Sequence, residues 1–136
     1  MLSLNADYIV PRISFEEIGG TIFEDEAKFC LGFDELFGKS LRFTSATPDD
    51  ILKWTSYSKD TVNFLRLSEK ITDFCMNRKV GLLIDEVDQA SDNQVFLHFL
   101  GMLREKYLAR KAKEDFTFFS VILAGVYDVK KGKTDF

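Results

Sequence analysis

The stretch VGLLIDE, residues 80–86, decides the fold class of this sequence. Residues 80–84 form an unbroken apolar run without the alternation of a half-exposed strand, which predicts a central parallel strand covered on both faces. Two acidic residues, Asp85 and Glu86, follow this run directly. Functional sites in open parallel sheets lie beyond the carboxyl ends of the strands, so this pair is the first candidate site.

Two other segments, residues 8–17 and 116–124, also have the composition of strands. Pro11 favours an edge strand for the first, or a strand that starts near Arg12, because proline cannot donate a hydrogen bond to a neighbouring strand. The second, FTFFSVILA, is predicted to be apolar on both faces and to end at Gly125.

Helical patterns separate these strands. Thr21 and Glu24 have the spacing of a capping box and predict a helix that ends near Gly38. Its predicted apolar stripe consists of Phe29, Phe33, Leu36 and Phe37. The motif TPDD, residues 47–50, predicts a short helix that is capped by its threonine, starts at its proline and ends by Tyr57.

A longer helix is predicted from near Ser58 or Asp60 to the polar residues 77–79, which suit a helix C-terminus. Its predicted apolar stripe consists of Val62, Leu65, Ile71, Phe74 and Cys75. Ser91 and Gln94 form a second capping box. The helix that follows is predicted to bury one face made of Phe96, Leu100, Leu103 and Tyr107.

The elements therefore run strand, helix, helix, strand, helix, strand. This order indicates an α/β fold with a short, mainly parallel sheet of about three strands and helices on its faces. A length of 136 residues fits a single domain over residues 1–136. Apolar residues make up 46% of the chain, and 14 of them are Phe, which is enough for a packed core.

Composition argues against several classes of protein. The net charge of −4 gives no overall basic field for nucleic acid or membranes. The N-terminus lacks the features of a signal peptide, and no apolar stretch approaches the ~20 residues of a membrane span. Cys30 and Cys75 have no metal-binding spacing, so we expect buried free thiols in a cytoplasmic protein.

An apolar strand that ends in Asp-Glu is the Walker B pattern of nucleotide hydrolases. The first acid holds Mg²⁺, usually through a water, because Mg²⁺ keeps much of its hydration shell. The second acid polarises a water for in-line attack on the γ-phosphate. The structural alternative is that the two acids cap the loop or helix that follows, and Asp88 has no assigned catalytic role.

Three longer blocks extend this pattern. They are ISFEEIGGTIFEDEAKF (13–29), GLLIDEVDQASDNQVFLHFLGMLREKYLARK (81–111) and FTFFSVILAGVYDVKKGK (116–133). Together they resemble a group of bacterial AAA-like P-loop ATPases over nearly the whole chain, with the blocks in the same order and spacing. The resemblance implies a three-layer P-loop NTPase sandwich of the ASCE type, with a second strand, a Walker B strand and a sensor strand.

The resemblance also implies ATP and Mg²⁺ as ligands. It places Asp85 on Mg²⁺, usually through a water, and gives Glu86 the role of general base. Ala124-Gly125, at the end of the predicted sensor strand, has no polar side chain that could read the γ-phosphate, so no sensor residue is assigned.

The chain departs from the family in its phosphate-binding loop. Members of the family carry a Walker A loop ending in Gly-Lys-Thr before the segment that matches here, and this loop binds the β- and γ-phosphates. Gly38-Lys39-Ser40 follows an amphipathic helix, with its first glycine one residue too far away. Gly132-Lys133-Thr134 has Tyr127 in place of the first glycine and no helix after it. Neither segment fits the strand–loop–helix context of Walker A.

We therefore expect a fragment of an AAA-like ATPase domain that is inactive alone, with Met1 either a truncation or a misplaced start, or else a degenerate remnant. A missing first strand would leave the edge of the sensor strand open. The chain is then expected to be weakly stable, to form a homo-oligomer, or to pair with the remainder of the ATPase or another polypeptide.

Other residues suggest further functions. The segment 104–113, REKYLARKAK, holds five cations and one acid and is typical of a solvated helix C-terminus. It could alternatively form a weak nucleic-acid patch, or use Arg104 as a trans contact to a neighbouring subunit. His98, the single histidine, is expected on a helix face, and Trp54 in the core. The alternative to an ATPase is a non-catalytic interaction module derived from an ATPase core.

Overall fold

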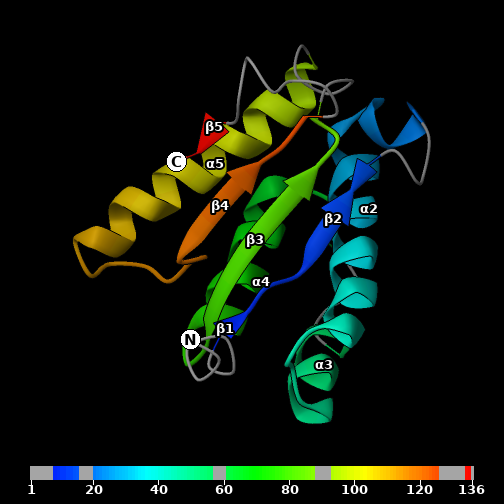
Figure 1. The fold of residues 1–136 in the computed structure, drawn as a ribbon. Helices are drawn as coiled ribbons and strands as arrows, with labels where there is room; N and C mark the ends of the chain where they lie inside the picture. The colour runs from blue at the N-terminus through cyan, green and yellow to red at the C-terminus, as the bar shows by residue number, and fades with distance from the viewer. Residues whose placement is uncertain (1–7, 16–19, 57–60, 88–92, 126–133, 136) are drawn as a thin grey trace.

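The computed structural model describes residues 8–15, 20–56, 61–87, 93–125 and 134–135 (Figure 1). The strands are β1 (Tyr8–Ile9), β2 (Arg12–Ser14), β3 (Lys79–Asp85), β4 (Ser120–Leu123) and β5 (Thr134–Asp135). The α-helices are α2 (Glu26–Ser40), α3 (Pro48–Thr55), α4 (Phe64–Cys75) and α5 (Gln94–Lys111). Two 3₁₀ turns are η2 (Gly20–Phe23) and η3 (Leu41–Phe43).

The strands form one sheet around β3. Both β1 and β2 pair with β3 in parallel, β3 pairs with β4 in parallel, and β5 pairs with β4 in the antiparallel direction. The chain is therefore an α/β protein with a small, mainly parallel sheet, and β3 is central as predicted. The edge of β4 that the sequence predicts to be open instead pairs with β5.

The predicted strand 8–17 is interrupted at Pro11. β1 ends at Ile9 and β2 begins at Arg12, which confirms the later start as one of the two predicted outcomes. Pro11 has no N–H, but its carbonyl accepts a hydrogen bond from the backbone N–H of Leu83 at 3.1 Å. The ladder to β3 therefore continues past the proline through its acceptor.

The described helices pack against one face of the sheet, and Figure 1 shows α4 and α5 behind β3 and β4. Burial alternates along β4: Val121 and Leu123 are buried, whereas Ser120 and Ile122 are exposed. Leu83 is aligned with Ile122, on the side away from the helices. The predicted cover on both faces is therefore wrong for the described part of the chain, because β4 carries apolar residues on a face that no described helix covers.

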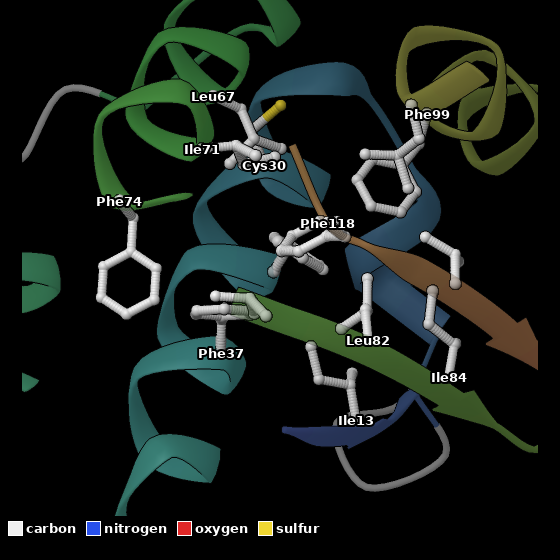
Figure 2. Close-up of a cluster of buried hydrophobic side chains, with 14 of the residues drawn as sticks. Ile13, Cys30, Phe37, Leu67, Ile71, Phe74, Leu82, Ile84, Phe99 and Phe118 are labelled. Carbon is white, nitrogen blue, oxygen red and sulfur yellow. The ribbon is translucent and has the colours of Figure 1, made fainter. Parts of the chain in front are cut away.

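Aromatic side chains fill the space between the sheet and the helices (Figure 2). Phe29, Phe33 and Phe37 of α2 are fully buried, as predicted. The ring of Phe99, from α5, lies 5.0 Å from Phe29 and 4.9 Å from Phe33 between centroids. Trp54 of α3 lies 4.3 Å from Phe37, so it is a core residue as expected. These rings join α2, α3 and α5 into one core.

Asp and Asn caps set where three of the helices begin. The capping residues are Asp25 for α2, Asn63 for α4 and Asn93 for α5. Each side chain accepts a hydrogen bond from a backbone N–H three residues further on, which satisfies an otherwise unpaired donor. The predicted first cap, Thr21, lies in η2 instead, and Ser58, Asp60 and Ser91 lie outside the described residues. α3 begins as predicted, with a complete capping box of Thr47 and Asp50.

The later start of α4 changes which of its residues are buried. Val62 and Leu65, which the sequence predicts to be buried, are 43% and 68% exposed. The buried residues of α4 are Leu67, Lys70, Ile71, Phe74 and Cys75. On α5, Lys106 is buried whereas Tyr107 is half-buried, so the predicted stripe is also shifted there.

Two buried lysines, one on α4 and one on α5, form ion pairs. Lys70 Nζ of α4 lies 2.7 Å from Asp34 Oδ2 of α2, and Lys106 Nζ of α5 lies 3.0 Å from Asp115 Oδ2. The lysine side chains are only 3% and 4% exposed. A charge at that depth is tolerated because it is paired and hydrogen-bonded.

Both cysteines are buried free thiols, as predicted. Burial raises the pKa of Cys30 and of Cys75 to about 12, because the thiolate is poorly solvated in the core. At neutral pH both groups therefore stay protonated and unreactive.

Candidate functional site at the carboxyl end of the central strand

The acidic pair lies where the sequence predicts it, at the carboxyl end of β3. Asp85 is the last residue of the strand, and Glu86 follows it. The parallel register places Ser14 of β2 beside Asp85. On the other side, the backbone N–H of Val87 donates to the carbonyl of Ala124 at 3.0 Å, which ties the segment after the pair to the end of β4. The two acids are thus held between the ends of two neighbouring strands.

Asp85 forms an ion pair with Arg12 of β2. The Nη2 and Nε atoms of Arg12 lie 2.6 and 3.2 Å from Asp85 Oδ2. The other oxygen, Oδ1, accepts a hydrogen bond from the backbone N–H of Glu86 at 2.8 Å. The side chain of Arg12 is 57% exposed and that of Asp85 is 26% exposed, so water screens the pair and its net contribution is about 0–1 kcal/mol.

Glu86 has a left-handed backbone conformation, with φ of 56°. For a residue other than glycine this conformation costs roughly 1–2 kcal/mol, and such strain concentrates at functional sites. The hydroxyl of Ser14, which is 6% exposed, donates a hydrogen bond to Glu86 Oε1. The Glu86 carboxylate is therefore oriented by a buried group rather than by solvent.

These residues have the donor chemistry that Mg²⁺ prefers. Mg²⁺ takes oxygen ligands, keeps several waters and commonly uses only one or two carboxylates when a substrate supplies phosphate oxygens. Asp85 alone is within that number, which leaves the Glu86 carboxylate available for another role. Within the described residues, no cluster of three or more metal-binding side chains occurs. A cation at Asp85 would share or displace the guanidinium of Arg12.

Sequence reasoning missed Arg12 and Ser14. Both are polar residues of a short strand, and they flank the buried Ile13. Ser14 comes two positions after Arg12, so the two side chains lie on the same face of the strand. The signal could have been found by aligning β2 in parallel with β3, since that alignment brings Ser14 directly beside Asp85.

The structure does not bring Arg104 to this site within one chain. Arg104 is exposed on α5, ten residues beyond the first residue of that helix, Gln94. At 1.5 Å per residue this is about 15 Å along the helix axis. A trans contact from Arg104 stays a prediction. His98 is exposed on α5, which agrees with its expected place on a helix face.

The first Walker A-like segment is helical, which confirms that it is not a phosphate loop. Gly38, Lys39 and Ser40 form the end of α2, where helix carbonyls rather than N–H groups are free. A side chain at Gly38 would meet the Trp54 ring at 3.4 Å, so this glycine serves helix packing and does not end the helix. In the second segment, residues 132 and 133 lie outside the described residues, as do Asp88 and Tyr127.

The predicted basic patch at residues 104–113 is not one continuous surface. Lys106 is buried, with Nζ donating to the Ser68 carbonyl at 3.1 Å and to Asp115. The guanidinium of Arg110 instead lies 4.1 Å over the ring of Phe119, beyond the helix. Lys106 is therefore not part of an exposed basic surface, and Arg110 is engaged by an aromatic ring outside the helix.

The comparisons with known proteins identify no relative of this chain. No protein-family model matches it, and neither the curated proteins nor the solved structures contain a significant match. Among the described residues, no helix combines the length and apolar composition needed to cross a bilayer. Function must therefore be inferred from the residues and their geometry.

Proposed function

We propose that this chain is the Walker B part of an AAA-like P-loop ATPase domain. The observation that supports the proposal is the position of Asp85 and Glu86 at the carboxyl end of β3, between two parallel neighbours. Ser14 orients Glu86 there, and Glu86 has a strained backbone. A merely solvent-exposed acidic turn would need neither the strain nor the buried hydroxyl.

In this proposal the two acids have separate roles. Asp85 would hold Mg²⁺ through water, and the bound ion would supply positive charge to the phosphate oxygens of ATP. Glu86 would orient the attacking water, with its carboxylate held by Ser14. The ion pair with Arg12 contributes about 0–1 kcal/mol, which Mg²⁺ and a triphosphate together can outweigh. Phosphate binding would depend on a Walker A loop, which neither Gly-Lys segment of this sequence supplies, so this chain alone would bind ATP weakly and would not hydrolyse it.

The three-layer P-loop fold is part of the same proposal. The exposed face of the sheet, which includes Leu83 and Ile122, would be covered by the remainder of the ATPase or by another subunit. Homo-oligomer formation through an Arg104 trans contact, and a cytoplasmic location, fit this assignment and are proposed with it.

Paramagnetic line broadening by Mn²⁺ tests the proposed metal site directly. With Mn²⁺ and ATP present, we expect the backbone amide signals of Ser14 and residues 85–87 to broaden first. Asp85→Asn should abolish this pattern, whereas Asp49→Asn, which removes an exposed carboxylate on α3, should leave it unchanged. Broadening elsewhere, or broadening that survives Asp85→Asn, would refute the proposed site. Micromolar ATP binding by this chain would refute its assignment as a fragment without a phosphate loop.

The second candidate function is a non-catalytic interaction module that keeps an ATPase-like core. The observation that favours it is the Arg12–Asp85 ion pair, because a tethered cation already neutralises the proposed metal ligand. Arg12→Ala separates the two functions. If Mn²⁺ broadens the site in the natural chain and Arg12→Ala raises its affinity up to about fivefold, the ATPase assignment holds. If broadening requires Arg12→Ala, the interaction module is favoured.

A further inference from the structure

A hollow lies at the opposite end of β3 from the acidic pair. It has a volume of about 550 Å³ and forms where the turn after α4 meets the segment that joins α5 to β4. Residues 75–79 form one wall. The other wall consists of Arg110, Lys113, Asp115, Phe116, Thr117 and Phe119. The hollow thus combines two segments that are distant in the sequence, and it is separate from the Asp85–Glu86 site.

Cationic side chains dominate the charge of this hollow. Arg110 lies in the last turn of α5 and Lys113 follows that helix, whereas Lys79 is the first residue of β3 and Arg78 precedes it. Among the described residues that line the hollow, Asp115 is the single acidic residue. Its carboxylate is already paired with Lys106. Arg78 is paired with Asp50. Lys79, Arg110 and Lys113 still give the hollow a local excess of positive charge, in a chain whose net charge is −4.

Aromatic surface lies among these cations. Phe116 is 43% exposed and Phe119 is 36% exposed, and both line the hollow. The guanidinium of Arg110 lies 4.1 Å over the ring of Phe119. The ring of Phe116 and the outer plane of the Arg110 guanidinium are two flat surfaces of the kind on which unpaired bases stack.

We propose that this hollow binds single-stranded nucleic acid. Lys79 and Lys113 would contact the phosphate backbone, while Phe116 and the Arg110–Phe119 stack would hold bases. Flat aromatic and guanidinium surfaces favour this ligand over an acidic peptide, which has charge but few planar groups. A duplex would present its phosphates but keep its bases stacked internally. The proposal is independent of the proposed ATPase function, because it uses none of the residues at the acidic site.

Fluorescence anisotropy with a labelled thymidine 12-mer at low salt tests the proposal. Phe116→Ala should weaken binding by about fivefold to a hundredfold, which is the usual effect of losing one base-stacking ring. The matched control is Phe43→Ala, since Phe43 is 89% exposed on η3 and does not line this hollow. Lys113→Glu should weaken binding and reduce the slope of log affinity against log salt by about 0.7 or more. Arg104→Glu, the same charge change on the exposed surface of α5, should do neither.

Competition identifies the class of ligand. Unlabelled single strand should displace the probe, whereas duplex of equal length and poly-glutamate should displace it at least tenfold less well. Effective competition by poly-glutamate would replace the proposal with an acidic protein partner. Equal losses for Lys113→Glu and Arg104→Glu, or no binding at 20 mM salt, would overturn it. Thermal melts of each variant verify that a loss of binding is not a loss of fold.

Discussion

Removing Asp115 should destabilise the protein much more than removing its partner Lys106. In Asp115→Ala the ammonium group of Lys106 stays in a site where its side chain is 4% exposed. Two neutral acceptors remain for it, the carbonyl of Ser68 and the hydroxyl of Thr72. In Lys106→Met the remaining carboxylate of Asp115 is 21% exposed and keeps two donors, Thr72 and the backbone N–H of Phe116. The stranded charge is therefore deeply buried in the first variant and partly hydrated in the second.

The structure sets the size of this difference. Breaking a buried pair by removing one partner costs about 3–5 kcal/mol, and the two remaining acceptors of Lys106 place Asp115→Ala near 3 kcal/mol. Lys106→Met replaces a charge by an apolar chain of similar length, so about 1 kcal/mol is expected. At roughly 2–4 °C per kcal/mol for a chain of this size, the melting temperatures should fall by roughly 6–12 °C and 2–4 °C.

Urea denaturation of both variants measures the two free energies of unfolding. Glu114→Ala, which removes the exposed acid next to Asp115, is the control and should change stability by less than about 0.5 kcal/mol. The reasoning is refuted if Lys106→Met costs as much as Asp115→Ala, or if Asp115→Ala costs no more than the control. Either result would mean that water reaches Lys106 and that its charge is not stranded.

The same carboxylate predicts a pH dependence. Burial alone would raise the pKa of Asp115, but hydrogen bonds from Thr72, Lys106 and the backbone of Phe116 outweigh it and hold the pKa below its usual value. Stability from this group is therefore fully present above the unfolded-state pKa of about 4, and it is lost as the pH falls through the folded-state pKa. The stabilities of the natural chain and Asp115→Asn should differ most at neutral pH and converge in acid.

Three further predictions test the fold. Thr47→Ala removes the side-chain cap of α3 and should lower the free energy of unfolding by about 1 kcal/mol in urea denaturation. Leu65→Gln should change stability by less than about 0.5 kcal/mol, whereas Leu67→Ala should cost about 2–5 kcal/mol; the reverse order in the same assay would show that α4 is rotated. Burial raises the pKa of Cys30 and of Cys75 to about 12, so both thiols should react with a thiol reagent at pH 8 only as fast as the protein unfolds, and rapid labelling would contradict their burial.

The central strand and its acidic end could be predicted from the sequence because their signal is local. An unbroken apolar run identifies β3, and the two acids after it lie at the carboxyl end by chain direction alone. The start of α3 could equally be predicted, because Pro48 favours the first position of a helix and so marks Thr47 as its cap. The parallel direction of β2, β3 and β4 also followed, because strands that alternate with helices are joined by crossover connections.

The remaining features depend on contacts that the sequence pattern does not contain. Several capping residues compete before α2, and Asp25 prevails because η2 first places Ile22 in the core at 4% exposure. A lysine at a helical position indicates a solvated face, so the buried Lys106 could not be found without its partner Asp115. The number of layers in the fold could not be predicted from the sequence either, because the apolar residues of β4 do not reveal which face of the sheet the helices cover.

Register between β2 and β3 links the core to the candidate site. Ile13 lies between Arg12 and Ser14 and is 1% exposed, so a shift of one residue would turn it away from the core and bury a polar neighbour. Burial of the Ile13 side chain favours the observed register by roughly 1.5–3 kcal/mol. The cost of burying Arg12 in the shifted register would add to this difference. The screened Arg12–Asp85 pair contributes less than this and cannot fix the register by itself. The position of both acids relative to Arg12 and Ser14 is therefore a consequence of how Ile13 packs in the core.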